Sequence, residues 1–328
     1  MKCAVFLFPG QGAQYTGMAM DLIESDAVKS LFDTASNAIG KDIKKLLQSD
    51  TDTLKRTDIS QPAITAANLA AAAYLGEKGF SPAVCAGFSL GEYAALVCAG
   101  VLNAADCFRL VKARGEIMQK AADLLCAKSG SGADGVSDAP GMAAVVGLSP
   151  DQAEKLIAKW SEEGCYPSDS LKDLYAANIN SPKQLVISGT AAALSQAEIR
   201  FKEAWAKRVI RLQVAGPFHS PLMAEAAREF TSVLEEAVFR DPMIPVFSNV
   251  TGKRITSGEE AKKLASLHIT HPVRWVEEEA AIAAFGVEVC FEAGPGRVLQ
   301  GLWKDSGNTA PVFAAGTAQD ISILGENV

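Results

Sequence analysis

The sequence contains few histidines and no clustered cysteines. Histidine occurs three times in 328 residues, and the seven cysteines are an odd number with no C-x-x-C pair among them. They are spread along the whole chain, at Cys3, Cys85, Cys98, Cys107, Cys126, Cys165 and Cys290. Zinc sites and disulfide frameworks need clustered or regularly spaced cysteines. We therefore expect reduced, mostly buried thiols in a reducing compartment, and no metal site.

The chain also lacks an excess of basic residues and any long apolar run. Lys and Arg number 31 against 38 Asp and Glu, a formal net charge of −7, so no global field attracts nucleic acid or an anionic membrane. Pro9 and Gly10 interrupt the first apolar run too early for a signal peptide, and no later run approaches a membrane span. We expect a cytoplasmic protein without nucleic-acid or membrane partners.

The residues that are present indicate a globular α/β fold. Hydrophobic residues make up 48% of the chain and charged residues 21%, and the length exceeds the roughly 100–200 residues of one domain. Short apolar runs alternate with longer helical patterns, as in a mainly parallel α/β sheet. One predicted helix covers residues 60–80, with Pro62 expected in its first turn, where the missing N–H is not needed.

A change in element order indicates a second domain. Residues 129–141 are rich in Gly, Ser and Asp without periodicity, which predicts a loop. Residues 142–214 then read as β-α-β-β-α-β, the ferredoxin-like arrangement, and a strand is expected at 244–250. We predict an α/β-hydrolase-like large domain of residues 1–141 and 215–328 that carries residues 142–214 as an inserted small domain.

The segment GFSLG, residues 87–91, fits the G-x-S-x-G nucleophile elbow. In this motif the glycines let the chain turn sharply from strand to helix and hold the serine hydroxyl at the sheet edge. An apolar run precedes Ser89 and an alanine-rich helical pattern follows it, which is the context that the motif requires. The pentapeptide alone also permits a serine that caps a helix, but the context favours a nucleophile.

The scarcity of histidine narrows the choice of a base for Ser89. His219 lies between two prolines in GPFHSPLM, after the last strand of the predicted small domain. His268 and His271 have a spacing of three, but Pro272 opposes a helix there and no cysteine or acidic ligand stands nearby, so a metal pair is not expected. We interpret these two as surface or packing histidines and His219 as the candidate base.

Two further features point to acyl chemistry. Arg114 falls on the apolar face of its own predicted helix, where a guanidinium needs a partner such as a substrate carboxylate; the alternative is a side chain that reaches the surface. The turn FPGQG follows the first strand and lacks the Lys and Ser/Thr of a phosphate loop. It offers the Gln11 N–H to an oxyanion, although by itself it is only a turn.

With these features, the sequence resembles the malonyl-CoA:acyl carrier protein transacylase family over nearly its whole length. The matching motifs stand in family order: FPGQGAQ, SQPA, GFSLGEYAAL, the arginine of KARGEIMQ, ANINSPKQLVISG, GPFHSPLM, FSNVTGK, PVRW and EAGPGRVLQGL. The resemblance implies an α/β-hydrolase-like domain with a ferredoxin-like insertion. It also implies malonyl transfer from malonyl-CoA to acyl carrier protein in type II fatty acid synthesis.

The resemblance assigns roles to individual residues. It makes Ser89 the nucleophile, His219 the base and Arg114 the clamp on the malonyl carboxylate, with the N–H groups of Gln11 and Leu90 as the oxyanion hole. The family orients its histidine with a main-chain carbonyl in place of an Asp, and we expect that carbonyl to belong to Arg274. The remaining substrate-binding candidates are Gln11, Asn178, Asn180 and Asn249.

The resemblance also implies partners and leaves open questions. It implies a monomer without a resident cofactor, which uses malonyl-CoA and the phosphopantetheine thiol of the carrier protein. The chain departs from the family at Phe88, where the elbow usually has histidine, and in the length of the 129–141 loop. The loop is expected to lie near the cleft. The Phe88 departure leaves the Ser-His dyad intact and puts the acyl selectivity in doubt.

Alternative functions remain open from the sequence. A stand-alone acyltransferase of a polyketide or polyunsaturated fatty acid synthase would share the same dyad. A serine hydrolase would instead place an acidic third member between Ser and His, and a non-catalytic protein would not need Ser89, His219 and Arg114 together. Near the end of the predicted small domain lies a basic cluster of Arg200, Lys202, Lys207, Arg208 and Arg211. It is interpreted either as a docking surface for an acidic carrier protein or as a solvated helix face.

Overall fold

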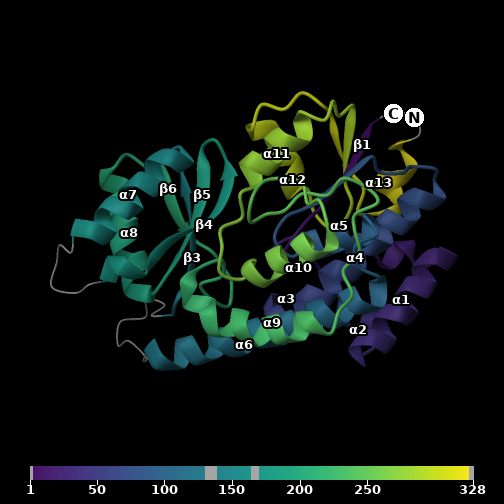
Figure 1. Ribbon diagram of the computed structural model, residues 1–328, viewed down its shortest axis with the longest axis horizontal. Coiled ribbons are helices and arrows are strands. Elements are labelled where there is room, and N and C mark those ends of the chain that lie inside the picture. The colour runs from purple at the N-terminus through teal and green to yellow at the C-terminus, as the bar shows by residue number, and fades with distance from the viewer. Residues whose placement is uncertain (1–2, 130–138, 164–169, 325–328) are drawn as a thin grey trace.

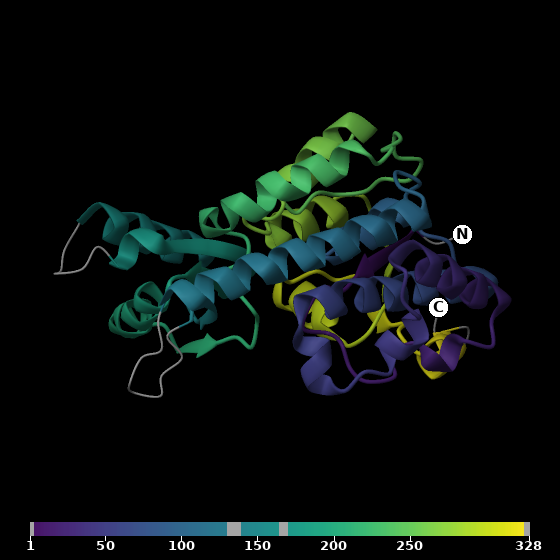
Figure 2. The same ribbon diagram turned by 90° about the horizontal axis from the view of Figure 1, so that it is seen from below.

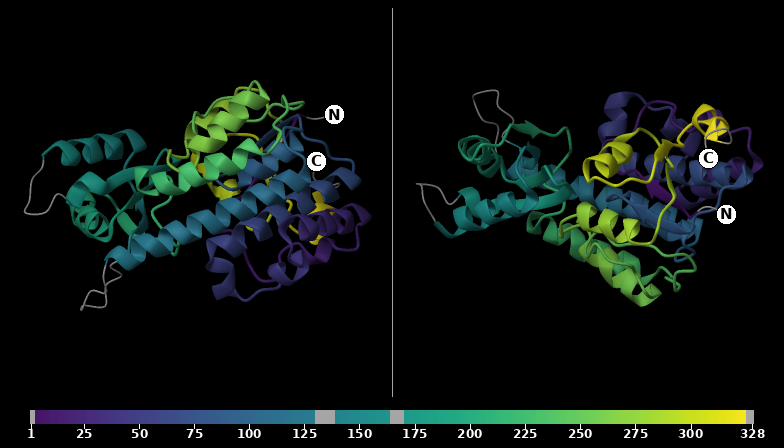
Figure 3. Two further views of the ribbon diagram at one scale, coloured as in Figure 1. Left: turned by 60° about the horizontal axis from the view of Figure 1, so that its bottom comes forward. Right: turned by 90° about the horizontal axis from the view of Figure 1, so that it is seen from above.

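The computed structural model describes residues 3–129, 139–163 and 170–324, which form two lobes (Figure 1). The larger lobe is built around a parallel sheet and the smaller lobe around an antiparallel sheet. Helix α6 (Ala104–Ser129) runs from the larger lobe to the smaller one, as Figures 2 and 3 show. Most of the predicted 129–141 loop lies outside the described residues.

The parallel sheet has the strand order β2-β1-β7-β8. Its strands are β1 (Ala4–Phe8), β2 (Val84–Gly87), β7 (Val289–Glu292) and β8 (Val312–Ala314). In β1, Phe6 and Phe8 pack into one apolar cluster, and Val5 and Leu7 pack into another. Because successive side chains of a strand point to opposite faces, both faces of this sheet are covered. This explains why the strand reads as an unbroken apolar run.

Helices pack on the parallel sheet and on one another in the larger lobe. They are α1 (Asp26–Ile39), α2 (Ile43–Leu47), α3 (Thr51–Lys55), α4 (Thr57–Glu77), α5 (Gly91–Cys98), α6, α9 (Ala224–Glu235), α10 (Gly258–Leu267), α11 (Trp275–Ala283), α12 (Val298–Asp305) and α13 (Ala318–Ser322). Several begin at a polar cap. The Ser25 side chain accepts a hydrogen bond from the Val28 N–H, and the Ser257 side chain accepts one from the Glu260 N–H. Such caps pair N–H groups that the first helical turn leaves free.

Two details of the larger lobe differ from the sequence predictions. Helix α4 begins at Thr57, so Pro62 lies inside it and not in its first turn. Arg56 is the N-cap residue of this helix, and its side chain makes no capping hydrogen bond. The sequence therefore has no capping residue that would predict a helix beginning at Thr57. Residues 244–250 form only single bridges, Val246 to Cys85 and Phe247 to Arg254. The apolar run at 244–250 therefore packs beside β2 without forming the expected strand.

The smaller lobe has its own sheet and core. Its elements are β3 (Gly141–Val146), α7 (Pro150–Glu163), β4 (Leu174–Ser181), β5 (Gln184–Gly189), α8 (Ala191–Glu203) and β6 (Arg208–Arg211). The strand order is β4-β5-β3-β6, with antiparallel neighbours. The rings of Trp160 and Phe201 meet edge to face at 4.8 Å in the core beneath the sheet. The order of elements is the one expected from the sequence.

The lobes are joined by main-chain hydrogen bonds as well as by α6. The Ile179 N–H donates to the Val273 carbonyl at 2.7 Å, and the Val273 N–H donates to the Ala177 carbonyl at 2.9 Å. These bonds fix β4 against the segment that precedes α11. Among the described residues, no helix combines the length and apolar content that crossing a membrane requires.

Candidate active site

The nucleophile elbow lies where two neighbouring strands end. β1 and β2 are parallel, and Phe8 pairs in register with Gly87. The turn after β1 and the turn after β2 therefore leave the sheet at the same edge. A Cβ atom on Gly87 would lie 2.1 Å from the Gly91 carbonyl oxygen, and one on Gly91 would lie 2.0 Å from that of Phe8. Only glycine permits this close packing of elbow and strand.

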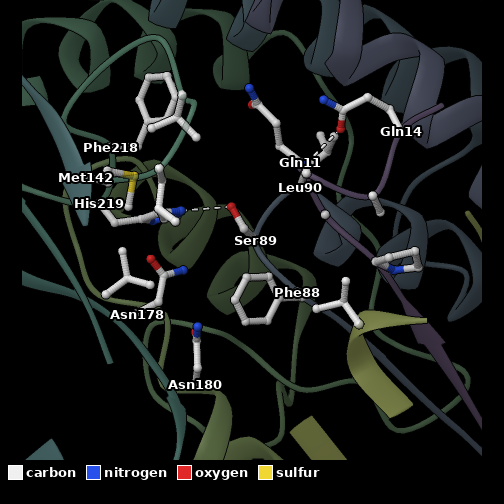
Figure 4. Close-up of a pocket in the computed structure, with 18 of the residues that line it drawn as sticks. Gln11, Gln14, Phe88, Ser89, Leu90, Met142, Asn178, Asn180, Phe218 and His219 are labelled. Carbon is white, nitrogen blue, oxygen red and sulfur yellow. Dashed lines mark hydrogen bonds between the residues drawn. The ribbon is translucent and has the colours of Figure 1, made fainter. Parts of the chain in front are cut away.

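Ser89 and His219 form a hydrogen-bonded pair. Ser89 Oγ and His219 Nε2 are 2.8 Å apart (Figure 4). Both residues have left-handed backbones, with φ values of 49° for Ser89 and 56° for His219. Such conformations are unfavourable for residues other than glycine and concentrate at functional sites. The loop of His219 is further held because the Ser220 hydroxyl donates to the Pro217 carbonyl at 2.6 Å.

The partners of His219 determine its protonation. Nδ1 lies 2.9 Å from the His268 carbonyl oxygen and 3.2 Å from that of His271. Because carbonyl oxygens only accept hydrogen bonds, Nδ1 carries the proton and Nε2 accepts from the Ser89 hydroxyl. Burial, and to a lesser extent the nearby Arg114 charge, lower the pKa of His219 to about 4, against the opposing effect of the two carbonyls. The imidazole is therefore a neutral base at neutral pH.

The carbonyl that orients His219 is not that of Arg274, so this prediction was wrong. Arg274 is the residue before α11, and its carbonyl accepts the Glu278 N–H at 3.0 Å, the first bond of that helix. The segment that follows α10 instead turns the carbonyls of His268 and His271 toward the imidazole. The principle of a main-chain acceptor holds, but the acceptors lie three to six residues earlier in the chain.

Two main-chain N–H groups border the space in front of Ser89. Gln11 follows β1 and Leu90 precedes α5, and Figure 4 shows both beside Ser89. In the described part of the chain, neither the Gln11 N–H nor the Leu90 N–H has a hydrogen-bond acceptor. The first turn of α5 directs its positive end to the same point. This arrangement is suited to an oxyanion.

Arg114 is a buried cation that faces the same space. Its side chain is 1% exposed, and its guanidinium lies 5.6 Å from the centre of the Tyr93 ring. Among the described residues no carboxylate lies within 4.0 Å of it, and its Nε has no hydrogen-bond partner. Burial lowers the pKa of this guanidinium, yet arginine stays charged in proteins. A buried arginine without a carboxylate is costly unless a ligand supplies one.

A cavity of about 540 Å³ between the lobes contains these groups. From the larger lobe it is lined by Gln11, Ser89, Leu90, Arg114 and His219, and from the smaller lobe by Met142, Asn178, Asn180 and Val186. A second cavity of about 610 Å³ shares Lys55, Met142 and Leu212 with the first and adds Arg56 and Arg211. The cavity of the reactive pair thus adjoins a second cavity whose lining includes basic residues.

The three asparagines predicted at the site have different positions. Asn178 and Asn180 lie on β4 and line the cavity (Figure 4). Asn249 is fully buried and is absent from the cavity wall. Both atoms of its side-chain amide are bonded within the protein, since Oδ1 accepts from the Ser89 N–H at 2.5 Å and Nδ2 donates to the Gly87 carbonyl at 2.7 Å. The prediction that Asn249 binds substrate was wrong, because its side chain holds the elbow.

Phe88 forms part of the cavity wall next to Ser89. Its ring meets the ring of Trp275 edge to face at 5.4 Å, and Figure 4 places it between Ser89 and Asn180. The Phe88 N–H continues the sheet by donating to the Phe8 carbonyl at 2.9 Å. Phe88 therefore packs against α11 and gives the pocket an apolar floor without contributing to the Ser89–His219 pair.

His268 belongs to the site although its sequence context predicted only a surface or packing histidine. Its side chain is 1% exposed and lies 3.3 Å from Arg114 Nη2, while its carbonyl faces His219. No local pattern marks this residue, because a carbonyl contact depends only on the path of the chain. Arg114, His219 and the segment from His268 to His271 come from distant parts of the sequence and meet only in the folded protein.

Comparisons with known proteins agree with this geometry. Residues 5–325 match the family model described as "Acyl transferase domain". The chain is 37% identical over 325 residues to the malonyl CoA-acyl carrier protein transacylase of Bacillus subtilis, covering 98% of this chain and 96% of that protein. It is 41% identical over 308 residues to the protein of the same name in Haemophilus influenzae, covering 93% and 92%.

Solved structures give the same result. A structure of the malonyl CoA-acyl carrier protein transacylase of Coxiella burnetii superposes with a TM-score of 0.87 at 31% identity, covering 98% of this chain and 96% of that one. A structure described as a type II PKS acyl-carrier protein in complex with its malonyl-transacylase superposes with a TM-score of 0.86 at 35% identity, covering 99% of each chain.

Proposed function

Because the chain belongs to the malonyl CoA-acyl carrier protein transacylase family, we propose that it transfers a malonyl group from malonyl-CoA to acyl carrier protein in type II fatty acid synthesis. One observation carries the proposal. The hydrogen-bonded pair Ser89 and His219 lines a cavity, and Arg114 lines the same cavity. Arg114 is a buried cation that has no carboxylate partner among the described residues.

In the first half-reaction, Ser89 attacks the thioester carbonyl of malonyl-CoA. His219 Nε2 takes the hydroxyl proton as the Oγ–carbon bond forms. The N–H groups of Gln11 and Leu90 stabilise the negative oxygen of the tetrahedral intermediate. The carbon–sulfur bond then breaks, and the CoA thiolate leaves with the proton from His219. The product is a malonyl ester of Ser89.

In the second half-reaction, the phosphopantetheine thiol of the carrier protein replaces CoA. The neutral His219 accepts the thiol proton, and the sulfur attacks the malonyl ester. The tetrahedral intermediate collapses with release of Ser89 Oγ, which regains the proton from His219. The two cavities that share Lys55 and Leu212 provide a passage for the thiol, and Lys55, Arg56 and Arg211 provide cations for the phosphate groups of CoA and of phosphopantetheine.

Arg114 gives the proposed reaction its selectivity. A malonyl carboxylate in the cavity pairs with the guanidinium, whereas an acetyl group leaves the buried charge without a partner. Breaking a buried ion pair by removal of one partner typically costs about 3–5 kcal/mol. A difference of that size discriminates between acyl groups by a factor of at least about 100.

We also propose the finer description of the fold. Residues 142–214 are a ferredoxin-like domain inserted into an α/β-hydrolase-like domain of residues 1–141 and 215–328. The strand order β4-β5-β3-β6, with α7 and α8 packed on the sheet, supports the first part. The parallel sheet with a nucleophile elbow after β2 supports the second.

The proposed reaction needs no resident cofactor, because side chains and main-chain N–H groups supply the acid-base and electrostatic chemistry. We infer that the chain acts as a monomer in the cytoplasm. Cys3, Cys85, Cys98, Cys107, Cys126 and Cys290 are free thiols in the described residues, which supports a reducing compartment. Cys165 lies outside those residues.

Two alternatives are weighed against this function. The similarity to the complex described with a type II PKS acyl-carrier protein favours a polyketide pathway as the second candidate. A serine hydrolase would place a carboxylate at His219 Nδ1. Within the described residues the groups at that atom are the carbonyls of His268 and His271, which disfavours a hydrolase.

The proposal is tested by malonyl transfer to purified holo-carrier proteins. The parent protein is expected to load a fatty acid synthase carrier protein from malonyl-CoA, and Ser89→Ala is expected to lose this activity. Preferential loading of a polyketide carrier protein would support the second candidate. Malonyl-CoA hydrolysis faster than transfer to either carrier would contradict both.

A further inference from the structure

His268 connects the proposed carboxylate clamp to the nucleophile elbow. It follows α10 directly and its side chain is 1% exposed. Its Nδ1 atom lies 3.3 Å from Arg114 Nη2, and its Nε2 atom lies 3.2 Å from Asn249 Oδ1. One imidazole ring therefore contacts both the guanidinium and the residue that holds Ser89.

The chemistry of the partners fixes the hydrogen on each ring nitrogen. A guanidinium only donates, so Nδ1 of His268 must accept from Arg114. Nε2 then carries the hydrogen and donates to Asn249 Oδ1. Burial and the Arg114 charge lower the pKa of His268 well below its usual value. The ring is neutral, as acceptance from a cation requires.

Asn249 carries the connection onward to Ser89. Its Oδ1 accepts from the Ser89 N–H at 2.5 Å as well as from His268, and its Nδ2 donates to the Glu278 carboxyl at 2.8 Å. Arg114, His268, Asn249 and Ser89 are thus connected by hydrogen bonds. Arg114 and Ser89 line the cavity, whereas His268 and Asn249 lie behind its wall. The ring fixes the direction of the guanidinium relative to the nucleophile.

The orientation of the Arg114 guanidinium matters because the carboxyl group of Glu92 is a competing partner for it. The Oε2 atom of Glu92 lies 3.7 Å from His268 Nε2 and accepts the Asn249 N–H at 2.7 Å. Burial raises the pKa of Glu92 to about 7. The Asn249 N–H and the Arg114 charge partly oppose this rise. A guanidinium released from the His268 ring is expected to be drawn toward this carboxyl group, with which it interacts electrostatically.

We propose that the His268 side chain is a positioning residue that holds the Arg114 guanidinium toward the cavity and so sets the preference for a carboxylated acyl group. This inference rests on the proposed malonyl transfer. It is separate from the role of the His268 carbonyl, which faces His219 and is present whatever the side chain. The imidazole acts through Arg114 and does not touch the acyl group.

The test compares His268→Leu with His268→Gln in the full chain. Leucine fills much of the same volume without an acceptor or a donor. Glutamine supplies one carbonyl oxygen for Arg114 and one N–H for Asn249 Oδ1. The readouts are kcat/KM for Ser89 loading by malonyl-CoA and by acetyl-CoA, and labelling of Ser89 by a neutral fluorophosphonate, which needs the dyad but not the clamp.

His268→Leu is expected to lower the malonyl-to-acetyl ratio by about 10-fold or more, mainly through the KM for malonyl-CoA, because a buried charged hydrogen bond is lost. Fluorophosphonate labelling reports any accompanying change in the dyad, and malonyl loading is expected to fall by more than the labelling rate falls. His268→Gln is expected to recover most of the malonyl-to-acetyl ratio. A reduced fluorophosphonate rate in parallel with malonyl loading would instead assign His268 to the dyad alone and overturn the proposal.

An unchanged malonyl-to-acetyl ratio in His268→Leu would also overturn it. So would a failure of His268→Gln to recover the ratio while its thermal unfolding matches that of the parent protein. The proposed function fails by a different observation, namely a parent protein that is not malonylated at all. Failure of the positioning role and failure of the proposed reaction are therefore distinguishable.

Discussion

Arg114 is the residue on which acyl selectivity depends most directly. Truncation to alanine removes the buried cation and leaves an uncharged space in the cavity wall. Arg114→Ala is therefore expected to lower kcat/KM for malonyl loading by about 100-fold or more and to raise the acetyl-to-malonyl ratio. Loading from both thioesters is measured by intact-protein mass spectrometry. Malonyl loading at the parent rate would refute the clamp assignment.

The protonation of His219 gives a prediction for pH dependence. The base works only when neutral, and its pKa is lowered from 6.5 to about 4 by burial and by Arg114. A fall in pH therefore protonates it only well below its usual range. The rate of Ser89 loading is expected to show no inflection near pH 6.5 and to fall below about pH 5. An activity loss centred near pH 6.5 would contradict the neutral, buried imidazole.

At the residue scale, the sequence predicted the groups that have a local signal. Ser89 lies in a glycine-flanked elbow, Arg114 interrupts an apolar helix face, and His219 is one of only three histidines. The structure brings these three to one cavity. The carbonyl acceptor was assigned wrongly to Arg274 because any residue has a carbonyl, and only the path of the chain selects His268 and His271.

At the scale of elements, the segment after residue 244 positions the elbow without being a regular strand. In place of strand pairing, the Asn249 side chain holds this segment: it accepts a hydrogen bond from the Ser89 N–H and donates to the Gly87 carbonyl and the Glu278 carboxyl. The Asn249 N–H also donates to Glu92 on α5, at 2.7 Å. This one side chain joins the end of β2 to the start of α11.

Asn249→Ala is expected to destabilise the protein by about 3 kcal/mol, because it leaves several buried polar groups without partners. The free energy of unfolding is measured by urea denaturation. Asn178→Ala is the matched control, because its side chain faces the cavity (Figure 4) and its truncation is expected to cost less than about 1 kcal/mol. Equal costs for the two variants would contradict the holding role of Asn249.

Elements with strong periodicity were predictable, and those that depend on tertiary contacts were not. The strands and helices of the smaller lobe have clear periodic patterns, and their order β-α-β-β-α-β was predicted. The start of α4 at Thr57 was missed, because contacts with α6 support its first turn. There the Thr57 N–H donates to Gln119 at 2.8 Å, and Gly115 packs against the Thr57 carbonyl.

At the scale of the whole molecule, the site exists only because two lobes meet. The smaller lobe has one apolar cluster of its own, while the main cluster of the larger lobe extends to Met142 and Val186 of the smaller lobe. The cavity takes residues from both lobes. The basic cluster lies on the smaller lobe, where Lys207 and Arg208 are exposed at the start of β6 and Trp205 is 88% exposed beside them. This surface combines positive charge with an apolar side chain, which suits an acidic carrier protein.

Charge reversal tests this docking surface. Lys207→Glu with Arg208→Glu is expected to raise KM for the carrier protein by about 10-fold, with KM for malonyl-CoA within about 2-fold of the parent value. Lys41→Glu with Lys45→Glu makes the same change in net charge at exposed positions of the larger lobe and is expected to affect neither. Equal effects of the two double variants on the carrier protein would point to net charge and not to docking.

The central claim is that Ser89 carries the malonyl group during transfer. Intact-protein mass spectrometry after brief mixing with malonyl-CoA, followed by peptide mapping, tests it most directly. The expected result is one added malonyl group on the peptide that contains Ser89, removed by holo-carrier protein and absent from Ser89→Ala. Transfer of malonyl to the carrier protein without that adduct, or an adduct that persists in Ser89→Ala, would contradict the claim.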